Sequence, residues 1–216
     1  PTLTGIVEDF GCLTGQSSSF LISGEGFIRA PMDALPSVTV GGVDASVLDA
    51  QGCEAIADAP GFERCTELSI ELADGALMPG QHDVVVTNPG STDCSSTETL
   101  SLEIFPAPTV TEAQPNFFCD EDSDTTLTVT GQDFFTVNQV LPVVVIDGQE
   151  FTPTSATGCM PVDNKTQPLE RCTGLEVVIP QSSLTGGALD VMVRNPDPMA
   201  CTSEMGAGIY VVGPPE

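Results

Sequence analysis

The sequence has very few positive charges and few large aromatic rings. Only five of its 216 residues are Lys or Arg, against 31 Asp or Glu, so the net charge is −26. Nucleic acids and anionic membranes are bound through basic patches, and this balance therefore excludes nucleic-acid binding and disfavours docking on such membranes. Trp is absent and Tyr210 is the only tyrosine, so a packed core must be built from Val, Leu, Ile and the ten Phe.

The sequence also lacks the marks of several other protein classes. No run of about 18 apolar residues occurs, so neither a transmembrane helix nor membrane insertion is expected. No basic segment followed by an apolar one opens the chain, and Pro1 is not a usual first residue, so we expect a mature product or part of a longer protein. His82 is the only histidine and no two cysteines form a CxxC pair, which argues against Cys/His metal centres and thioredoxin-like redox sites.

Eight cysteines are present, and disulfides are the use that remains for them. Disulfides persist outside the reducing cytosol, so we expect an extracellular or cell-surface location. The cysteines recur as a set of four. Three of the four repeat with an offset of 107 residues and one with an offset of 106: Cys12 and Cys119, Cys65 and Cys172, Cys94 and Cys201, and Cys53 and Cys159.

The rest of the chain follows the same offset, which indicates a duplication. The matching segments are 23–27 and 130–134, 52–53 and 158–159, 63–66 and 170–173, and 88–89 and 195–196. We therefore predict two domains, residues 1–106 and 107–216. Pro106 and Pro108 lie at the boundary and restrict the backbone, so a semi-rigid pair is expected.

The hydrophobic pattern predicts strands throughout. Apolar residues alternate with polar ones in 20–23, 68–72, 100–104 and 127–130, and no stretch of twelve residues has a helical period. The 21 Gly and 18 Pro divide the chain at short intervals. About seven short strands per hundred residues predict an all-β fold of two tandem immunoglobulin-like Greek-key β-sandwiches.

With these segments in place, each half resembles the IPT/TIG family of immunoglobulin-like domains. The resemblance rests on an opening Pro-x-apolar strand at Pro1 and Pro108, and on strands at 20–23 and 127–130 that end at the glycine of a Gly-x-x-Phe motif, at 24–27 and 131–134. It rests also on a hairpin at 38–42 and a late strand that ends in Asn-Pro at 88–89 and 195–196. It implies a binding or spacing module. Members occur in receptors, bacterial adhesion proteins, secreted carbohydrate-active enzymes and transcription factors.

The family topology also implies a disulfide pattern. It places the first turn and the last hairpin at the same end of the sandwich, which predicts Cys12–Cys94 and Cys119–Cys201. The middle cysteines flank insertions relative to the family, which predicts Cys53–Cys65 and Cys159–Cys172. Each domain would then hold two disulfides. The patterns Cys12–Cys53 with Cys65–Cys94, and Cys12–Cys65 with Cys53–Cys94, stay open.

Two short motifs are candidates for a ligand and a modification. Asp120, Asp122 and Asp124 alternate in the densest acidic cluster and could bind Ca²⁺, which prefers oxygen ligands, although a solvated turn explains them as well. No other cofactor is expected. Asn164-Lys165-Thr166 fits the N-glycosylation sequon.

Other residues offer a site only weakly. A serine-hydrolase triad would need His82, which we expect to be an exposed turn residue. Phe117-Phe118 and Phe134-Phe135 are adjacent pairs, and one ring of each pair should face out of its strand, as a binding patch or as the cover of a domain junction.

The favoured interpretation is a non-catalytic structural and interaction module of a secreted or cell-surface protein. It would act as a rigid spacer, in adhesion, or as the subunit of an extracellular filament, with other proteins or further copies of itself as partners. The alternative is a carbohydrate-binding accessory module of a secreted enzyme, with a surface glycan as its ligand. That alternative is weakened by the absence of Trp, since sugars commonly stack on such rings.

Overall fold

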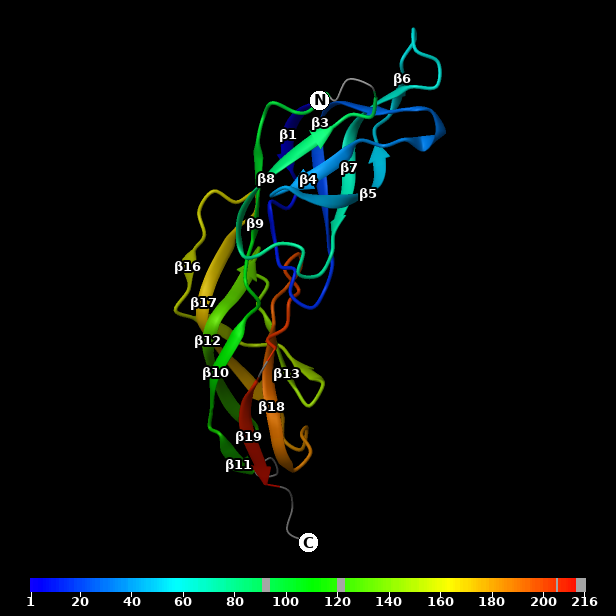
Figure 1. The fold of residues 1–216 in the computed structure, drawn as a ribbon. Coiled ribbons are helices and arrows are strands. Elements are labelled where there is room, and N and C mark those ends of the chain that lie inside the picture. Colours follow the sequence, from blue (N-terminus) through cyan, green and yellow to red (C-terminus); the bar gives the residue numbers. More distant parts are fainter. Residues whose placement is uncertain (91–93, 120–122, 205, 213–216) are drawn as a thin grey trace. The chain divides into compact units, whose positions relative to one another are not determined.

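The computed structural model describes residues 1–90, 94–119, 123–204 and 206–212, and the chain divides into two compact units, Pro1–Phe105 and Pro106–Glu216. Each unit is built of strands (Figure 1). A 3-10 turn at Pro31–Asp33 is the one helical element among the described residues. No helix in the described part of the chain has the length and hydropathy needed to span a membrane.

Unit 1 is a single sheet that folds around one core. Its strands run in the order β1-β3-β7-β5-β4-β8-β9-β2, with β6 added to β7. The strand β5 joins the two layers, because its first residues pair with β4 and its later ones with β7. The strands are β1 (Thr2–Ile6), β2 (Phe10–Gly11), β3 (Ser18–Arg29), β4 (Ser37–Val40), β5 (Val43–Gln51), β6 (Glu54–Ala55), β7 (Glu63–Leu72), β8 (Gly80–Thr87) and β9 (Leu100–Ile104).

Unit 2 has the same layers as two separate sheets. One has the order β10-β12-β17-β15 with β16 added to β17, and the other has the order β11-β19-β18-β13-β14. The strands are β10 (Thr109–Gln114), β11 (Phe117–Cys119), β12 (Thr125–Val137), β13 (Val143–Ile146), β14 (Gln149–Phe151), β15 (Ser155–Thr157), β16 (Met160–Pro161), β17 (Leu169–Ile179), β18 (Gly187–Arg194) and β19 (Ala207–Val212).

Pro153 accounts for this difference between the units. It lies between β14 and β15, where unit 1 has Val47 inside the continuous strand β5. Proline has no N–H to donate to a ladder, so the strand breaks where it would pass from one layer to the other. The chain still continues from one sheet to the other, and the two units keep the same arrangement of strands.

The Gly-x-x-Phe motifs form bulges inside long strands rather than strand ends. The expectation that the strands at 20–23 and 127–130 stop at glycine is wrong, since β3 and β12 continue past Gly24 and Gly131. Their registers with β7 and β17 shift between Ser23 and Phe27 and between Thr130 and Phe134. The extra residues bend each strand, and a side chain at either glycine would meet Phe27 Cζ at 2.5 Å or Phe134 Cζ at 2.6 Å.

Each unit encloses its own core of alternating strand residues. In unit 1 the largest fully buried side chains of the core include Phe27, Ile22 and Ile70. In unit 2 they include Phe134, Leu127 and Ile146. Because the inward positions are apolar in both units, what distinguishes the units lies on their surfaces.

Candidate functional site

Six of the eight cysteines are in disulfides, and all eight lie among the described residues. Cys53–Cys65 and Cys159–Cys172 are both present, with Cα–Cα distances of 3.9 Å. Cys12 and Cys201 are disulfide-bonded too. Cys94 and Cys119 are exposed thiols. The structure therefore holds three disulfides, and the expectation of two in each domain is wrong.

The predicted Cys12–Cys94 and Cys119–Cys201 bridges fail because their cysteines lie at opposite ends of a strand. In unit 1, β2 pairs with the end of β9, where the Phe105 N–H donates to the Gly11 carbonyl, so Cys12 lies beside that end. Cys94 instead precedes the start of β9. Four residue steps along β9 span about 13 Å, about twice the Cα separation that a disulfide allows. In unit 2, Cys119 pairs with the end of β19, while Cys201 precedes its start.

The two short disulfides fasten equivalent insertion loops to the long central strands. Cys65 and Cys172 are fully buried on β7 and β17, and their partners follow Gly52 and Gly158, both at φ +63°. A side chain at either glycine would overlap the hydroxyl of Thr66 or Thr173. Each loop therefore passes close to a threonine of the central strand and is joined to that strand by a disulfide, and both contacts restrict its conformation.

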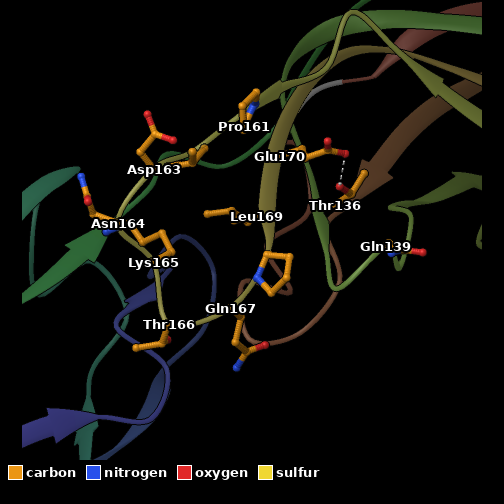
Figure 2. Close-up of a pocket in the computed structure, with 12 residues that line it drawn as sticks. Thr136, Gln139, Pro161, Asp163, Asn164, Lys165, Thr166, Gln167, Leu169 and Glu170 are labelled. Atoms are coloured by element: carbon orange, nitrogen blue, oxygen red, sulfur yellow. Dashed lines mark hydrogen bonds between the residues drawn. The ribbon is translucent and has the colours of Figure 1, made fainter.

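The insertion loop of unit 2 borders a hollow of about 500 Å³ that contains the sequon (Figure 2). Its lining includes the buried Leu169 together with Pro161 and Pro168, and the Thr136 hydroxyl donates to Glu170 at 3.3 Å. Asn164 is exposed at φ +59° and its side chain points away from the hollow. Its amide is accessible for glycosylation, which stays a prediction.

The calcium hypothesis falls mostly outside what the structure describes. Asp120 and Asp122 are outside the described residues, and the Asp124 carboxylate accepts the Gln181 N–H at 3.0 Å. Among the described residues, no three His, Cys, Asp or Glu side chains gather closely enough to hold a metal. Calcium binding at 120–124 stays a prediction.

His82 makes a local contact rather than a catalytic one. Its Nε2 lies 2.8 Å from the Met78 carbonyl, in the turn that leads into β8. A side chain at Gly41 would meet His82 Nδ1 at 2.6 Å, so the ring fills the space beside a hairpin glycine. The ring supports the turn, and its two nitrogens face a backbone carbonyl and a glycine.

Most of the cations lie against carboxylates. Arg29 contacts Asp33 at 2.6 Å and Glu63 at 3.5 Å, and the hydrogen bond to Asp33 raises the pKa of the Arg29 guanidinium. Arg194 contacts Glu150 at 2.8 Å. Each such pair neutralises a charge locally, and the acidic excess is left on the remaining surface.

The asparagine of each Asn-Pro motif holds the neighbouring bulge. In unit 1, Asn88 accepts the Ile28 N–H at 2.9 Å and donates to the Gly26 carbonyl at 2.8 Å. In unit 2, Asn195 accepts the Phe135 N–H and donates to the Asp133 carbonyl, both at 2.9 Å. Gly26 and Asp133 lie in the gaps of the register with β7 and β17, so the amide supplies a partner for their carbonyl groups.

One of the two expected aromatic patches exists. Phe118 is buried and Phe117 is 65% exposed, as the alternation predicts. Phe134 and Phe135 are both fully buried, so the expectation that one of them faces out is wrong. The bulge turns Phe135 under the Arg171 guanidinium, 6.0 Å from the ring centroid, and Arg171 also pairs with the buried Asp133 carboxylate.

Phe117 belongs to a broad apolar surface on one sheet of unit 2. Its ring stacks on Tyr210 with centroids 5.8 Å apart and planes 8° from parallel. Residues opposite each other in a ladder share a face, so the registers of β11, β19, β18, β13 and β14 define the outward side. We call it the β18 face: Phe117, Val143, Val145, Glu150, Ala188, Asp190, Met192, Arg194, Gly208 and Tyr210.

Most of the same positions in unit 1 are polar. The outward side of β9, β8, β4 and β5, which we call the β8 face, carries Ser37, Thr39, Asp44, Gln81, Asp83, Val85, Thr87, Ser101 and Glu103. Glu103 is replaced by Tyr210, Gln81 by Ala188 and Thr39 by Val145. Phe10, the equivalent of Phe117, is fully buried. A strand-by-strand comparison of the two repeats would have revealed this difference from sequence.

Comparisons with known proteins found only distant similarities. No protein-family model and no curated protein match the chain. One similar solved structure is SGBP-B of the Bacteroides ovatus mixed-linkage glucan utilization locus, in complex with a mixed-linkage heptasaccharide, at 13% identity and a TM-score of 0.31. The match covers 99% of this chain and 46% of that one, so the chain spans about half of that protein.

Two further similar structures are the ectodomain of the teleost fish polymeric Ig receptor and murine CEACAM1b. The first has 12% identity and a TM-score of 0.27, and the match covers 100% of this chain and 98% of that one. The second has 9% identity and a TM-score of 0.25, and the match covers 99% of both chains. These neighbours are immunoglobulin-like, and values this low carry no argument about function.

Proposed function

We propose that this chain is a non-catalytic structural and interaction module of a secreted or cell-surface protein. It consists of two IPT/TIG-like repeats, of which the second binds a partner through the β18 face. The observation that carries the proposal is the contrast between the two repeats: the β18 face is largely apolar where the β8 face is polar. The three disulfides support an oxidising, extracellular setting.

The contrast matters because folding does not require it. Unit 1 folds with Glu103, Gln81 and Thr39 at these outward positions, so the apolar residues of unit 2 do not serve the sandwich itself. Phe117 is 65% and Tyr210 50% exposed. Covering the exposed part of two such rings removes about 200 Å² from water, which favours association by about 5 kcal/mol before the costs of binding.

The spacer part of the proposal rests on how each repeat is held. In each repeat one long strand, β7 or β17, is fastened to the insertion loop by a disulfide, and its neighbour, β3 or β12, is fastened to the late Asn-Pro segment by an asparagine amide. Such cross-links reduce the number of conformations of a small domain. A repeat of this kind presents its outward face on a stiff support.

Hydrogen exchange followed by mass spectrometry tests the binding face. The chain is measured when dilute, when concentrated, and with a panel of soluble polysaccharides. We expect slower exchange in β11, β18 and β19 in at least one condition, with β8 and β9 unchanged. Protection confined to the hollow around 161–170, or none in any condition, would refute the assignment of the face. Hydrolysis of a polysaccharide by the purified chain would refute the non-catalytic part.

A carbohydrate-binding accessory module is the second candidate, and the stacked ring pair favours it. Sugar rings bind to exposed aromatic faces, and Phe117 and Tyr210 offer two nearly parallel rings without any Trp. Polysaccharide pull-down tests this candidate directly. A polysaccharide retained by the wild type, and bound at least about tenfold more weakly by Tyr210→Ala, would make a glycan the ligand of the face.

A further inference from the structure

We infer that the partner of the β18 face is a second copy of this chain, bound face to face about a two-fold axis with the two β18 strands antiparallel. This inference rests on the proposed function, because it names the occupant of the same face. Closed two-fold pairs use one self-complementary surface on both copies. The β18 face has the charge pattern that such a pair requires.

The charges along β18 are self-complementary. Asp190, Met192 and Arg194 are successive outward residues of this strand, so they present a negative, an apolar and a positive group in line. A two-fold axis through Met192 places Asp190 of each copy opposite Arg194 of the other. The parallel arrangement of the strands would set like charges against each other, so the charges select the antiparallel pair.

The remaining charge of the face is small compared with that of the molecule. Glu150 already contacts Arg194 at 2.8 Å, so the face carries two carboxylates and one guanidinium in a chain whose net charge is −26. The net charge makes two copies repel each other, and this face adds little to that repulsion. The β8 face of unit 1 has Asp83, Val85 and Thr87 at the equivalent positions, with no cation, so it cannot pair with itself in this way.

The antiparallel arrangement also determines what the aromatic pair would meet. Phe117 and Tyr210 lie at the end of the face where β18 begins. The two-fold axis reverses the direction of the strands but keeps their order across the face. The rings of one copy therefore lie over the β11 and β19 side of the other copy, towards the end where β18 stops, and this contact occurs twice in each pair.

The size of the face sets the expected affinity. Five strands at about 4.8 Å and about six residues at about 3.3 Å give roughly 24 by 20 Å, or roughly 500 Å² for each copy. The pair would then bury roughly 1,000 Å², at the lower end for specific interfaces. We therefore expect a dissociation constant of about 1–100 µM.

Analytical ultracentrifugation of the full chain tests the pair. It is run from about 1 µM to about 1 mM at about 0.15 M salt, where the Debye length of about 8 Å screens the net charge. We expect a concentration-dependent change from one copy to two. Tyr210→Glu, which installs the residue type found at Glu103, should weaken association at least about tenfold. Met192→Glu should abolish association, whereas Val85→Glu, which is the matched change to Met192→Glu in unit 1, should leave it unchanged.

A charge exchange between copies tests the antiparallel register. Asp190→Arg alone sets like charges against Arg194, and Arg194→Asp alone sets like charges against Asp190, so each variant should associate at least about tenfold more weakly. An equimolar mixture of the two variants should recover wild-type association to within about threefold. In a mixed pair, every charge at these positions faces a charge of the opposite sign on the other copy. Failure of the mixture to recover would refute the register. Unchanged circular dichroism and thermal midpoints show that each variant folds.

Cys119 requires a separate control because it is an exposed thiol on β11. Cys119→Ser should associate like the wild type, and non-reducing gels should show a single copy. Dimers that persist in denaturant, or that disappear with this variant, would mean cross-linking and would refute the proposal.

The outcomes separate this inference from the proposed function. A chain that stays monomeric to about 1 mM refutes the second copy as partner. If a polysaccharide then binds the wild type and not Tyr210→Glu, the face is a binding surface with a glycan occupant, and the proposed function stands. If neither copy nor polysaccharide protects β18 from hydrogen exchange, both proposals fail.

Discussion

Removing the asparagine of the second Asn-Pro motif should destabilise unit 2 more than the matching change destabilises unit 1. Asn195 is 2% exposed, and both of its hydrogen bonds, to the Phe135 N–H and the Asp133 carbonyl, are buried. Asn195→Ala removes the amide from both backbone groups. A buried group that loses its hydrogen bond costs about 1–3 kcal/mol, so the free energy of unfolding should fall by about 2–6 kcal/mol.

Asn88 provides the matched control within the same molecule. Its bonds to Ile28 and Gly26 have nearly the same lengths, but they are only partly buried, so water can replace the lost amide. We expect Asn88→Ala to lower the free energy of unfolding of unit 1 by about 1–2 kcal/mol. The difference between the two variants therefore measures burial rather than the number of hydrogen bonds.

Amide hydrogen exchange by NMR reports on the two sites separately, even where the units unfold in separate transitions. The Phe135 and Ile28 amides should lose protection in their own variants and keep it in the other. Thermal unfolding gives the total effect, and a loss of 2 kcal/mol corresponds to a midpoint lower by about 10 °C for a domain of this size. A larger loss for Asn88→Ala, or losses below about 0.5 kcal/mol for both, would refute the reasoning.

Two further pairs of variants test the bulges by thermal unfolding. Arg171→Ala should destabilise unit 2 by about 2–3 kcal/mol, because it leaves the Asp133 carboxylate, 8% exposed, without its cation. Asp133→Gly should cost less than about 1 kcal/mol, since Gly26 occupies this position in unit 1 at φ +74°. Gly24→Ala should lower the midpoint by more than about 5 °C through its clash with the backbone carbonyl of Thr2 and the ring of Phe27, whereas Gly5→Ala, with no atom within 4 Å, should leave it within about 2 °C. Equal effects of the two glycine variants would contradict the close approach.

The strands and the core could be predicted from the sequence because they depend on local patterns. Alternation of apolar residues marks β7, β9 and β17 directly, and the inward positions are the apolar ones. The strand ends were less predictable. The local sequence predicts that the strand ends at Gly24. The amide of Asn88, more than sixty residues away, instead holds the bulge so that β3 continues. No local pattern contains such a long-range contact.

The disulfides show the same limit. Cys53–Cys65 joins residues that are 12 apart, so the loop between them restricts the choice of partner. For Cys12 the partner depends on which end of β9 lies beside β2. The parallel pairing of Phe10 with Glu103 decides this, and hydrophobic alternation is the same for parallel and antiparallel neighbours. The wrong pairing therefore followed from an unknown strand direction.

The two repeats act as controls for each other in the search for function. Where both units keep a residue, as with the bulge asparagines, the cysteines of the loops and the inward strand positions, the shared fold explains it. Where they differ at an outward position, folding permits both residues and gives no reason for either.

Glu103 and Tyr210 occupy equivalent positions, one on an acidic surface and one in an exposed ring stack. A chain with net charge −26 gains solubility from acids at such positions, so their replacement by apolar residues on one face requires a benefit outside the fold. Contact with a partner is the benefit that exposed rings can provide.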